Sequence, residues 1–260
     1  MSAIIYYFSA TGNSLSVAKK LQQRLPDCQL VPVASLSDQT TIQPEQENVG
    51  FVFPLYYLGL PMIIRNFVTK LQLKDSTYLF AVITRGNKLA GGALHQLDRL
   101  LRLNGQKLQA GFYITLPDNY TPVLNLPNIK EQETQFQKSE TKVTQIAEQI
   151  LARKSLIEGA LFSCFHPVMN PGWVKRVKTT DRDFKATTSC NGCGVCVQIC
   201  PVDNIQLNAN QPLWQHHCEE CLACLHACPQ KAINKGGSSK KPQYRHPDVT
   251  LKEIMAQKNH

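Results

Sequence analysis

Short apolar runs alternate with amphipathic segments along the first 155 residues of the chain. Runs rich in strand-favouring residues predict five β-strands, at residues 3–9, 29–33, 49–53, 78–84 and 108–114. Apolar residues recur at the spacing of one helix face at residues 15–25, 62–73, 93–103 and 131–153. Strands that alternate with helices predict an α/β fold, with a doubly wound, five-stranded parallel sheet over residues 1–155.

The pattern changes after residue 155. Residues 156–188 contain prolines, glycines and several basic residues and lack a clean period, so we expect a connecting segment there. Phe162, Phe165 and Trp173 are its candidates for docking against a domain. Residues 236–260 are expected to form a basic C-terminal tail.

Residues 189–235 contain an internal repeat. A shift of 28 positions carries four cysteines, a proline and an isoleucine of the first half onto the same residue types in the second. Each half reads C-x-x-C-x-x-C-x-x-x-C-P, beginning at Cys190 and at Cys218. Six coincidences at one offset indicate a duplicated unit, so we expect a second, small α+β domain.

The spacing of these cysteines is typical of iron–sulfur ligation. Three cysteines three residues apart can wrap around one corner of a cluster, while the fourth ligates the other cluster in two-cluster ferredoxins. One [4Fe–4S] cluster is therefore assigned to Cys190, Cys193, Cys196 and Cys228. The second is assigned to Cys218, Cys221, Cys224 and Cys200. The segment resembles bacterial two-cluster ferredoxins at every cysteine position.

Structural zinc is the competing interpretation, because two C-x-x-C pairs can build a tetrahedral site. A zinc ribbon has no use for the middle cysteine of each half or for the proline, so iron–sulfur ligation is favoured. His216, His217 and His226 lie among the cysteines, but eight thiolates already complete two sites. We interpret these histidines as surface residues, one of which could tune a reduction potential.

A second candidate site follows the first predicted strand, in the heptapeptide FSATGNS. A loop between a strand and a helix can bind phosphate through the free N–H groups and the dipole of the helix N-terminus. Ser9, Thr11, Asn13 and Ser14 add side-chain donors, and Gly12 permits close backbone approach. The loop has no Walker lysine and no G-x-G-x-x-G pattern. The alternative is a helix cap without a ligand.

Given this loop at this position, residues 1–155 resemble flavodoxins, whose T-x-T-G-N-T-like loop binds the phosphate of FMN. Ser9 and Ser14 stand at the first and last positions of that pattern and keep its hydroxyls. The whole chain, including a late YRHP, is similar to the flavodoxin–ferredoxin fusion family of mostly anaerobic bacteria and archaea. The resemblance implies phosphate contacts from Ser9, Ala10, Thr11, Gly12, Asn13 and Ser14.

The resemblance also implies flavin-contacting loops after the third, fourth and fifth strands. Tyr56 or Tyr57 is the candidate to stack on the flavin ring, and the alternative places these tyrosines in the core. The loop after the fourth strand lacks the tyrosine common in flavodoxins, so Arg85 or a glycine is expected beside the ring, unless Arg85 is a solvated charge. The implied contacts are Pro54, Leu55, Tyr56, Tyr57 and Gly59; Thr84, Arg85, Gly86 and Asn87; and Asp118, Asn119 and Tyr120.

The formal net charge of +9 at pH 7 suggests an acidic partner. Two oxidised clusters would add about −4 and the FMN phosphate about −2, which leaves about +3. This lower charge weakens nucleic acid as a partner and suits an acidic ferredoxin, flavodoxin or oxidoreductase. The basic stretch at residues 235–245 is interpreted as solvated charge. No uncharged stretch is long enough to span a membrane without interruption by proline or glycine.

Flavins exchange one or two electrons, and iron–sulfur clusters pass one at a time. The favoured function is therefore electron transport, a relay between two clusters, FMN and a partner oxidoreductase. The alternatives are a flavin-dependent reductase of a small molecule or metallocofactor, and a redox-sensing binding module. No catalytic triad and no NAD(P) fingerprint is visible. The clustered cysteines and the absence of a signal-peptide pattern predict a cytoplasmic protein.

Overall fold

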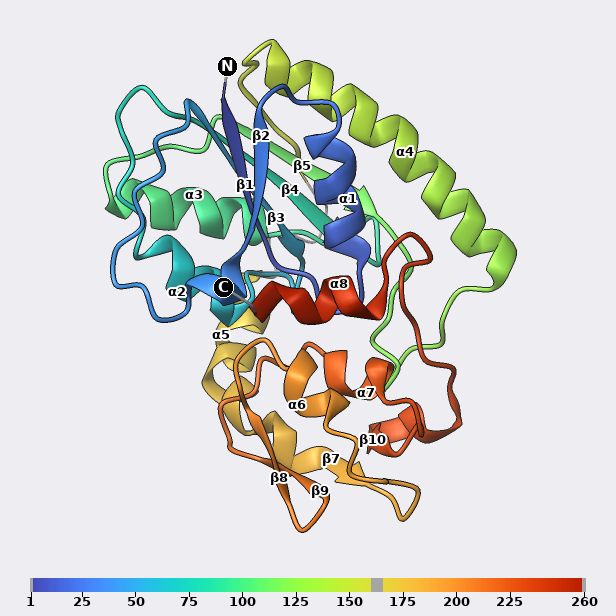
Figure 1. Ribbon diagram of the computed structural model, residues 1–260. Coiled ribbons are helices and arrows are strands. Elements are labelled where there is room, and N and C mark those ends of the chain that lie inside the picture. Colours follow the sequence, from blue (N-terminus) through green and yellow to red (C-terminus); the bar gives the residue numbers. More distant parts are fainter. Residues whose placement is uncertain (1, 160–165, 259–260) are drawn as a thin grey trace.

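A parallel sheet forms one half of the molecule (Figure 1). In this computed structural model, which describes residues 2–159 and 166–258, the strand order is β2-β1-β3-β4-β5-β6. The strands are β1 (Ala3–Tyr7), β2 (Cys28–Pro32), β3 (Asn48–Pro54), β4 (Tyr78–Arg85), β5 (Ala110–Thr115) and β6 (Leu156–Ile157). The five predicted strands are confirmed, and the two-residue β6 adds a sixth at the edge beside β5.

The sheet is apolar on both faces. One row of the register joins Tyr7, Val52, Val82 and Phe112 across β1, β3, β4 and β5, and all four side chains are buried. Continuous apolar runs of this kind are typical of parallel strands, which helices cover on either side. Because helices bury both faces of the strands, the strand sequences are apolar throughout. This explains why apolar runs without apolar–polar alternation predicted these strands correctly.

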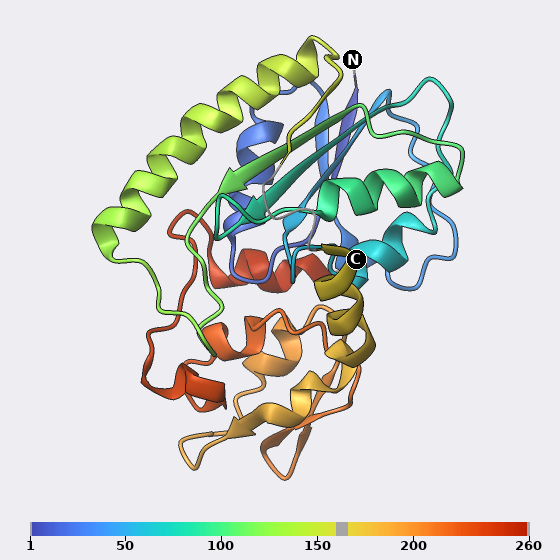
Figure 2. The ribbon, with the colours of Figure 1, turned by 180° about the vertical axis from the view of Figure 1, so that it is seen from behind.

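Helices cover both faces of the sheet. Figures 1 and 2 show α1 and α4 over one face and α2 and α3 over the other, and two separate apolar cores correspond to these faces. None of the helices in the described ranges is long and apolar enough to cross a membrane. The four helices are α1 (Asn13–Gln22), α2 (Met62–Val68), α3 (Ala93–Leu103) and α4 (Ile129–Leu151).

Helix α3 has the bounds that its apolar spacing predicts, whereas α2 is shorter than predicted. The apolar pattern continues to residue 73, but the helix ends at Val68. The chain then turns so that Leu71 joins Ile42 in a parallel β-bridge. Gln72 donates its backbone N–H to the Ile42 carbonyl at 2.9 Å. Pairing with a distant segment therefore replaces the last predicted helical turn.

The cysteine repeat folds beyond the carboxyl ends of the strands, in the lower half of Figure 1. Its helices are α6 (Val195–Ile199) and α7 (Ala223–Ala227), and its antiparallel pairs are β8 (Ile205–Asn208) with β9 (Gln211–Trp214) and β7 (Phe184–Ala186) with β10 (Ile233–Lys235). Because β7 lies in the expected connecting segment, the folded unit around the repeat begins before Cys190.

The connecting segment is more ordered than its irregular pattern suggested. It contains α5 (His166–Arg176) and a 3₁₀ segment, η3 (Val177–Asp183). Trp173 is fully buried, in agreement with its expected docking role. Phe162 and Phe165 lie outside the described residues.

The C-terminal segment is packed rather than solvated. It contains the 3₁₀ segments η4 (Gly236–Lys240) and η5 (Ala256–Lys258) and the helix α8 (Leu251–Met255). In Figures 1 and 2, α8 lies between the sheet and the helices of the cysteine repeat. Lys235, at the start of the basic stretch, is 5% exposed, so the interpretation of that stretch as solvated charge is wrong for this residue.

Gln257 joins the end of the chain to the end of β1. Its Nε2 donates to the Ser9 carbonyl at 2.8 Å, and its Oε1 accepts from the Ser9 N–H at 3.0 Å. Both residues are buried, so the backbone groups of Ser9 have no ready access to water. The C-terminal segment thus supports the loop that follows β1.

The Gln257→Ala variant should be markedly less stable than the parent protein. It leaves two buried backbone groups of Ser9 unpaired, at a cost of about 2–4 kcal/mol in the free energy of unfolding. Urea unfolding followed by tryptophan and flavin signals would measure this loss. Lys252→Ala, an exposed change in α8, is the matched control. Equal stability of the two variants would contradict the supporting role.

Candidate functional site

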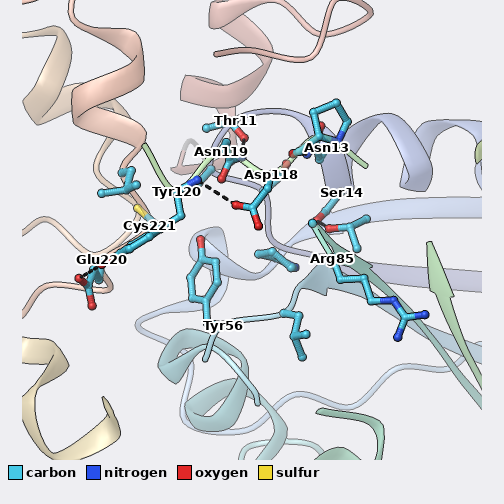
Figure 3. Close-up of a pocket in the computed structure, with 18 of the residues that line it drawn as sticks. Thr11, Asn13, Ser14, Tyr56, Arg85, Asp118, Asn119, Tyr120, Glu220 and Cys221 are labelled. Carbon is cyan, nitrogen blue, oxygen red and sulfur yellow. Dashed lines mark hydrogen bonds between the residues drawn. The ribbon is translucent and has the colours of Figure 1, made fainter. Parts of the chain in front are cut away.

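A cavity of about 240 Å³ lies at the carboxyl edge of the sheet (Figure 3). The strand order reverses between β1 and β3, and the loops after these strands contribute to its wall. Doubly wound sheets bind ligands at such a reversal. All the predicted FMN residues line this cavity except Gly12, Gly59 and Asn87.

Gly12 shapes the loop between β1 and α1 without lining the cavity. Its φ of 98° lies in the left-handed region, where glycine is favoured. A Cβ atom there would lie 3.0 Å from the Cβ atoms of both His246 and Val249. The Gly12 N–H donates to Ser9 Oγ at 3.2 Å, which tightens the turn. Any residue larger than glycine would strain this turn and press on the C-terminal segment.

Asn13 joins the loop after β1 to two other segments. Its Nδ2 donates to the Pro117 carbonyl at 3.1 Å, and its Oδ1 accepts from the Tyr244 hydroxyl at 2.6 Å. The amide nitrogen has a second hydrogen, so these contacts position the loop and leave one side-chain donor.

The hydroxyls of Thr11 and Ser14 connect this loop to the neighbouring loops of the cavity. Ser14 Oγ lies 2.8 Å from Thr84 Oγ1, and Thr11 Oγ1 accepts from Asn119 Nδ2. Both residues sit beside the first turn of α1, whose backbone N–H groups lack intrahelical acceptors. Hydroxyls and a helix N-terminus together favour an anion such as phosphate.

The loop after β3 holds two residues in a strained backbone conformation. Tyr57 and Leu58 have φ values of 46° and 62°, which are uncommon for residues with side chains. Tyr56 and Gly59 on either side exchange two backbone hydrogen bonds of 2.8 and 3.0 Å. A Cβ at Gly59 would lie 2.3 Å from the Asn170 side chain, so Gly59 permits the close packing behind the turn. Such strain persists only where the surrounding structure fixes it.

Of the two tyrosines, Tyr56 directs its hydroxyl into the cavity (Figure 3). Its ring packs edge-on against Phe8 and Trp173. The Tyr57 ring stacks on Trp173, with 5.5 Å between ring centroids and 16° between planes. Trp173 lines the cavity as well, although no sequence motif marked it as a site residue.

Arg85 extends away from Tyr56 and Cys221 in Figure 3. Its guanidinium lies 4.3 Å from the centroid of the Tyr113 ring and donates to the Ala90 carbonyl at 2.5 Å. Burial lowers the pKa of Arg85. The Arg85 guanidinium is thus held between the Tyr113 ring and the Ala90 carbonyl. It is not fully solvated, and it does not point to the centre of the cavity.

Gly86 packs directly against the side chain of Asp118, and both residues line the cavity. A Cβ at Gly86 would lie 2.2 Å from Asp118 Oδ2, so only glycine fits there. Asp118 Oδ1 accepts from the Tyr120 N–H at 3.0 Å, which fixes the carboxylate. Asn87 is exposed and its side chain accepts from the Leu89 N–H, so it turns away from the cavity.

The cysteine repeat itself contributes to the cavity wall, through Glu220, Cys221 and Leu222. Glu220 Oε1 accepts from the Tyr120 hydroxyl at 2.9 Å, and Oε2 accepts from Trp173 Nε1 at 2.9 Å. Lys235 Nζ lies 3.4 Å from Glu220 Oε1 in the same buried region. These contacts bring a predicted cluster ligand to the predicted flavin site.

Glu219 makes a second contact between the two halves of the molecule. Its Oε1 accepts from the Ile63 N–H at 3.1 Å, at the beginning of α2. Burial raises the pKa of Glu219 to about 8. The residues between Cys218 and Cys221 therefore hold this loop against both the β3 and the β5 side of the cavity.

The sequence contains a signal for these contacts. The second half of the repeat has Glu219 and Glu220 where the first half has Asn191 and Gly192. Acidic side chains between two cysteine ligands add negative charge next to negative sulfurs. Such an arrangement requires hydrogen-bond donors from other parts of the fold. The difference between the halves therefore indicates that the second half, which carries the two acidic residues, packs against another part of the protein.

The structure brings cysteines of both halves of the repeat together. Cys190, Cys193, Cys196 and Cys228 line one small cavity. Burial raises the pKa of Cys224, and the charges of Cys221, Cys200 and Cys218, with that of Cys196, raise it further, so Cys200 lies near the second triplet. The fold thus brings the last cysteine of each half to the triplet of the other half.

The surroundings of these sulfurs fit an iron–sulfur cluster. Burial raises the pKa of Cys196 to about 11 and that of Cys218 to about 12, so bound cations are needed to keep them as thiolates. Backbone N–H groups of Asn204 and Ala232 donate to Cys200 and Cys228 at 3.2 and 3.3 Å. Such hydrogen bonds tune cluster potentials. Within the described ranges, no group of three or more His, Cys, Asp or Glu side chains is placed to hold a single metal ion.

His226 is buried, so the expectation of a surface residue is wrong here. Its Nε2 donates to the Asn119 carbonyl at 2.9 Å, and its Nδ1 accepts from the Tyr244 N–H at 3.1 Å. Burial lowers its pKa to about 4, which agrees with a neutral ring. His216 and His217 are exposed as expected. His226 connects the cysteine repeat to the β5 loop and the C-terminal segment.

Comparisons with known proteins match the two parts separately. Residues 4–111 match the model of the flavodoxin domain, and residues 189–233 match the 4Fe-4S dicluster domain. A ferredoxin of Pyrobaculum islandicum is 34% identical over 53 residues, which are 19% of this chain and 49% of that protein. An uncharacterized protein of Methanocaldococcus jannaschii is 35% identical over 52 residues, 20% of this chain and 14% of that protein. The chain thus spans half or less of the length of these relatives.

Solved structures align with part of the chain. A flavodoxin of Streptococcus pneumoniae TIGR4 aligns with a TM-score of 0.40 and 18% identity, over 59% of this chain and 99% of that chain. An FMN-dependent NADH-azoreductase of Bacillus anthracis aligns with a TM-score of 0.41 and 9% identity, over 58% and 99%. From the two domain matches, the chain consists of a flavodoxin domain followed by a 4Fe-4S dicluster domain.

Proposed function

We propose that the protein relays single electrons between two [4Fe–4S] clusters and FMN inside one chain. The observation that carries this proposal is the shared cavity: Cys221, a predicted cluster ligand, lines it together with the phosphate-loop residues Ser9 and Thr11. A cluster ligand beside a flavin site provides a short path for an electron. FMN would supply the ability to exchange both one and two electrons.

The residues of the cavity have distinct roles in this proposal. Ser9, Ala10, Thr11 and Ser14 bind the phosphate, while Gly12 and Asn13 shape and anchor their loop. Tyr56, Gly86 and Asp118 border the flavin ring, and the backbone of Arg85 contributes to the same wall. Trp173 and Tyr120 hold Glu220, and through it Cys221, against the cavity.

We call Cys218, Cys221, Cys224 and Cys200 the proximal cysteines, because Cys221 belongs to the flavin cavity. Cys190, Cys193, Cys196 and Cys228 are the distal cysteines. The proposed order of electron carriers is distal cluster, proximal cluster and FMN, in either direction. Each group provides four thiolates, the number that one [4Fe–4S] cluster requires.

The same geometry favours a relay over a small-molecule reductase. A reductase needs an open space above the flavin ring for its substrate. Glu220, Cys221 and Leu222 of the cluster domain, together with Trp173, line the same cavity as the phosphate loop. In a relay, the cluster domain takes the place that a substrate would need. The redox-sensing alternative rests only on the basic residues of the C-terminal segment, of which Lys240 and Arg245 are exposed.

Anaerobically purified protein should contain about eight irons and one FMN per chain, because two groups of four cysteines and one phosphate loop are present. Iron, acid-labile sulfide, zinc and flavin are measured on the same sample. Stoichiometric zinc with little sulfide would contradict the cluster assignment. About four irons would show that one cysteine group is not a cluster site.

Cys200→Ala should damage the proximal cluster although Cys200 belongs to the first half of the repeat. The distal cluster should survive, and FMN should stay bound because its loop is untouched. Reduction of FMN through the clusters should slow by at least about tenfold, since the middle carrier is lost. Site-resolved EPR and stopped-flow absorbance measure the two effects.

Cys228→Ala is the matched variant, since it removes the equivalent ligand of the distal cluster. It should leave the proximal cluster intact next to the flavin. If Cys200→Ala removed the distal cluster instead, crossed ligation would be wrong. If it removed the proximal cluster without slowing FMN reduction, the relay would be wrong while the ligand assignment stood.

A further inference from the structure

The two halves of the cysteine repeat face different surroundings. In the second half, Glu219 and Glu220 are buried and contact the flavodoxin domain. In the first half, the equivalent Asn191 is exposed, and so is Cys193. The duplicated unit thus has one side directed at the flavin cavity and one side directed at solvent.

The solvent-facing side forms a small corner around the distal cysteines. Asn191, Leu207 and Gln230 line the cavity of these cysteines and are exposed, and Leu207 is 40% exposed. Of the described residues that line this cavity, the cysteines alone are ionisable. The surface around the distal cysteines is therefore uncharged and partly apolar, in a chain with a net charge of +9.

An exposed lysine borders this uncharged corner. Lys231 directly follows Gln230, which lines the distal cavity. An uncharged centre with a charged border is typical of protein interfaces, where the border controls the association rate.

We propose that this corner, formed by Asn191, Cys193, Leu207 and Gln230 with Lys231 beside it, is the docking site of a small acidic iron–sulfur electron carrier. The proposal rests on the proposed relay, since it names where electrons from outside reach the clusters. A one-electron carrier suits this site because a cluster accepts one electron at a time. The corner is small, as expected for the weak encounters of redox proteins.

The electron balance is simple. With a cluster held by the distal cysteines, the carrier would lose one electron and that cluster would gain it. No bond would form or break in this step, and the oxidised carrier would then dissociate. A second carrier molecule would deliver the second electron needed to reduce FMN fully, with protons supplied by solvent.

The test uses the holoprotein and a small acidic two-cluster bacterial ferredoxin as the probe. Calorimetry measures binding of the oxidised ferredoxin at low salt, and stopped-flow absorbance measures electron delivery from the reduced ferredoxin. Leu207→Glu and Lys231→Glu should each lower the affinity for ferredoxin and the rate of electron delivery by about tenfold. Each variant adds a negative charge that repels the acidic ferredoxin, at the centre of the interface for Leu207 and at its border for Lys231. Added salt should weaken the parent interaction.

Matched controls carry the same chemical changes elsewhere. Leu103→Glu on α3, where the leucine is 76% exposed, and Lys138→Glu on α4 should behave as the parent protein does. Iron content verifies that each variant retains its clusters. Photoreduced 5-deazariboflavin, a small donor that needs no docking surface, should reduce the clusters of all variants at the parent rate.

Three outcomes would overturn the proposal: no binding or electron delivery by ferredoxin, equal effects of the corner and control variants, or reduction of FMN before the distal cluster. Failure of the relay has a different signature. In that case ferredoxin would reduce the distal cluster and the corner variants would slow this step, but the electron would never reach FMN.

Discussion

The arrangement of this protein depends on how Cys218–Cys221 is held against the flavin cavity. The loop carries two buried acidic side chains, Glu219 and Glu220, beside cysteine sulfurs, and such burial is costly unless hydrogen-bond donors compensate it. The donors come from three other parts of the chain: the Ile63 N–H, the Tyr120 hydroxyl and Trp173 Nε1. The connecting segment, the cavity loops and the cluster domain are therefore fixed by one buried network.

The C-terminal segment supports the same junction from the other side. His246 donates its N–H to the Thr11 carbonyl at 2.9 Å, and Tyr244 donates its hydroxyl to Asn13. Tyr244 also donates its N–H to His226 of the cluster domain. A segment that appears as a charged tail in the sequence thus joins the phosphate loop to the cysteine repeat. Loss of its contacts would loosen both sites together.

Much of the architecture was predictable from local patterns, because parallel strands leave continuous apolar runs and α3 leaves a clean helical period. The cysteine groups were predictable because their spacing is set by a cofactor of fixed size. Contacts between distant segments were not predictable, and they explain the shorter α2 and the packed C-terminus. Asn13 is the clearest case: its type suits a phosphate donor, but its partners Pro117 and Tyr244 lie more than 100 residues away.

The central claim is that electrons pass between the clusters and FMN within one chain. The direct measurement is the rate at which FMN is reduced after a flash has reduced the clusters, followed at several protein concentrations. The account predicts a first-order rate that is independent of concentration, because Cys221 already lies at the flavin cavity. A rate that rises in proportion to protein concentration would mean transfer between molecules and would contradict the account.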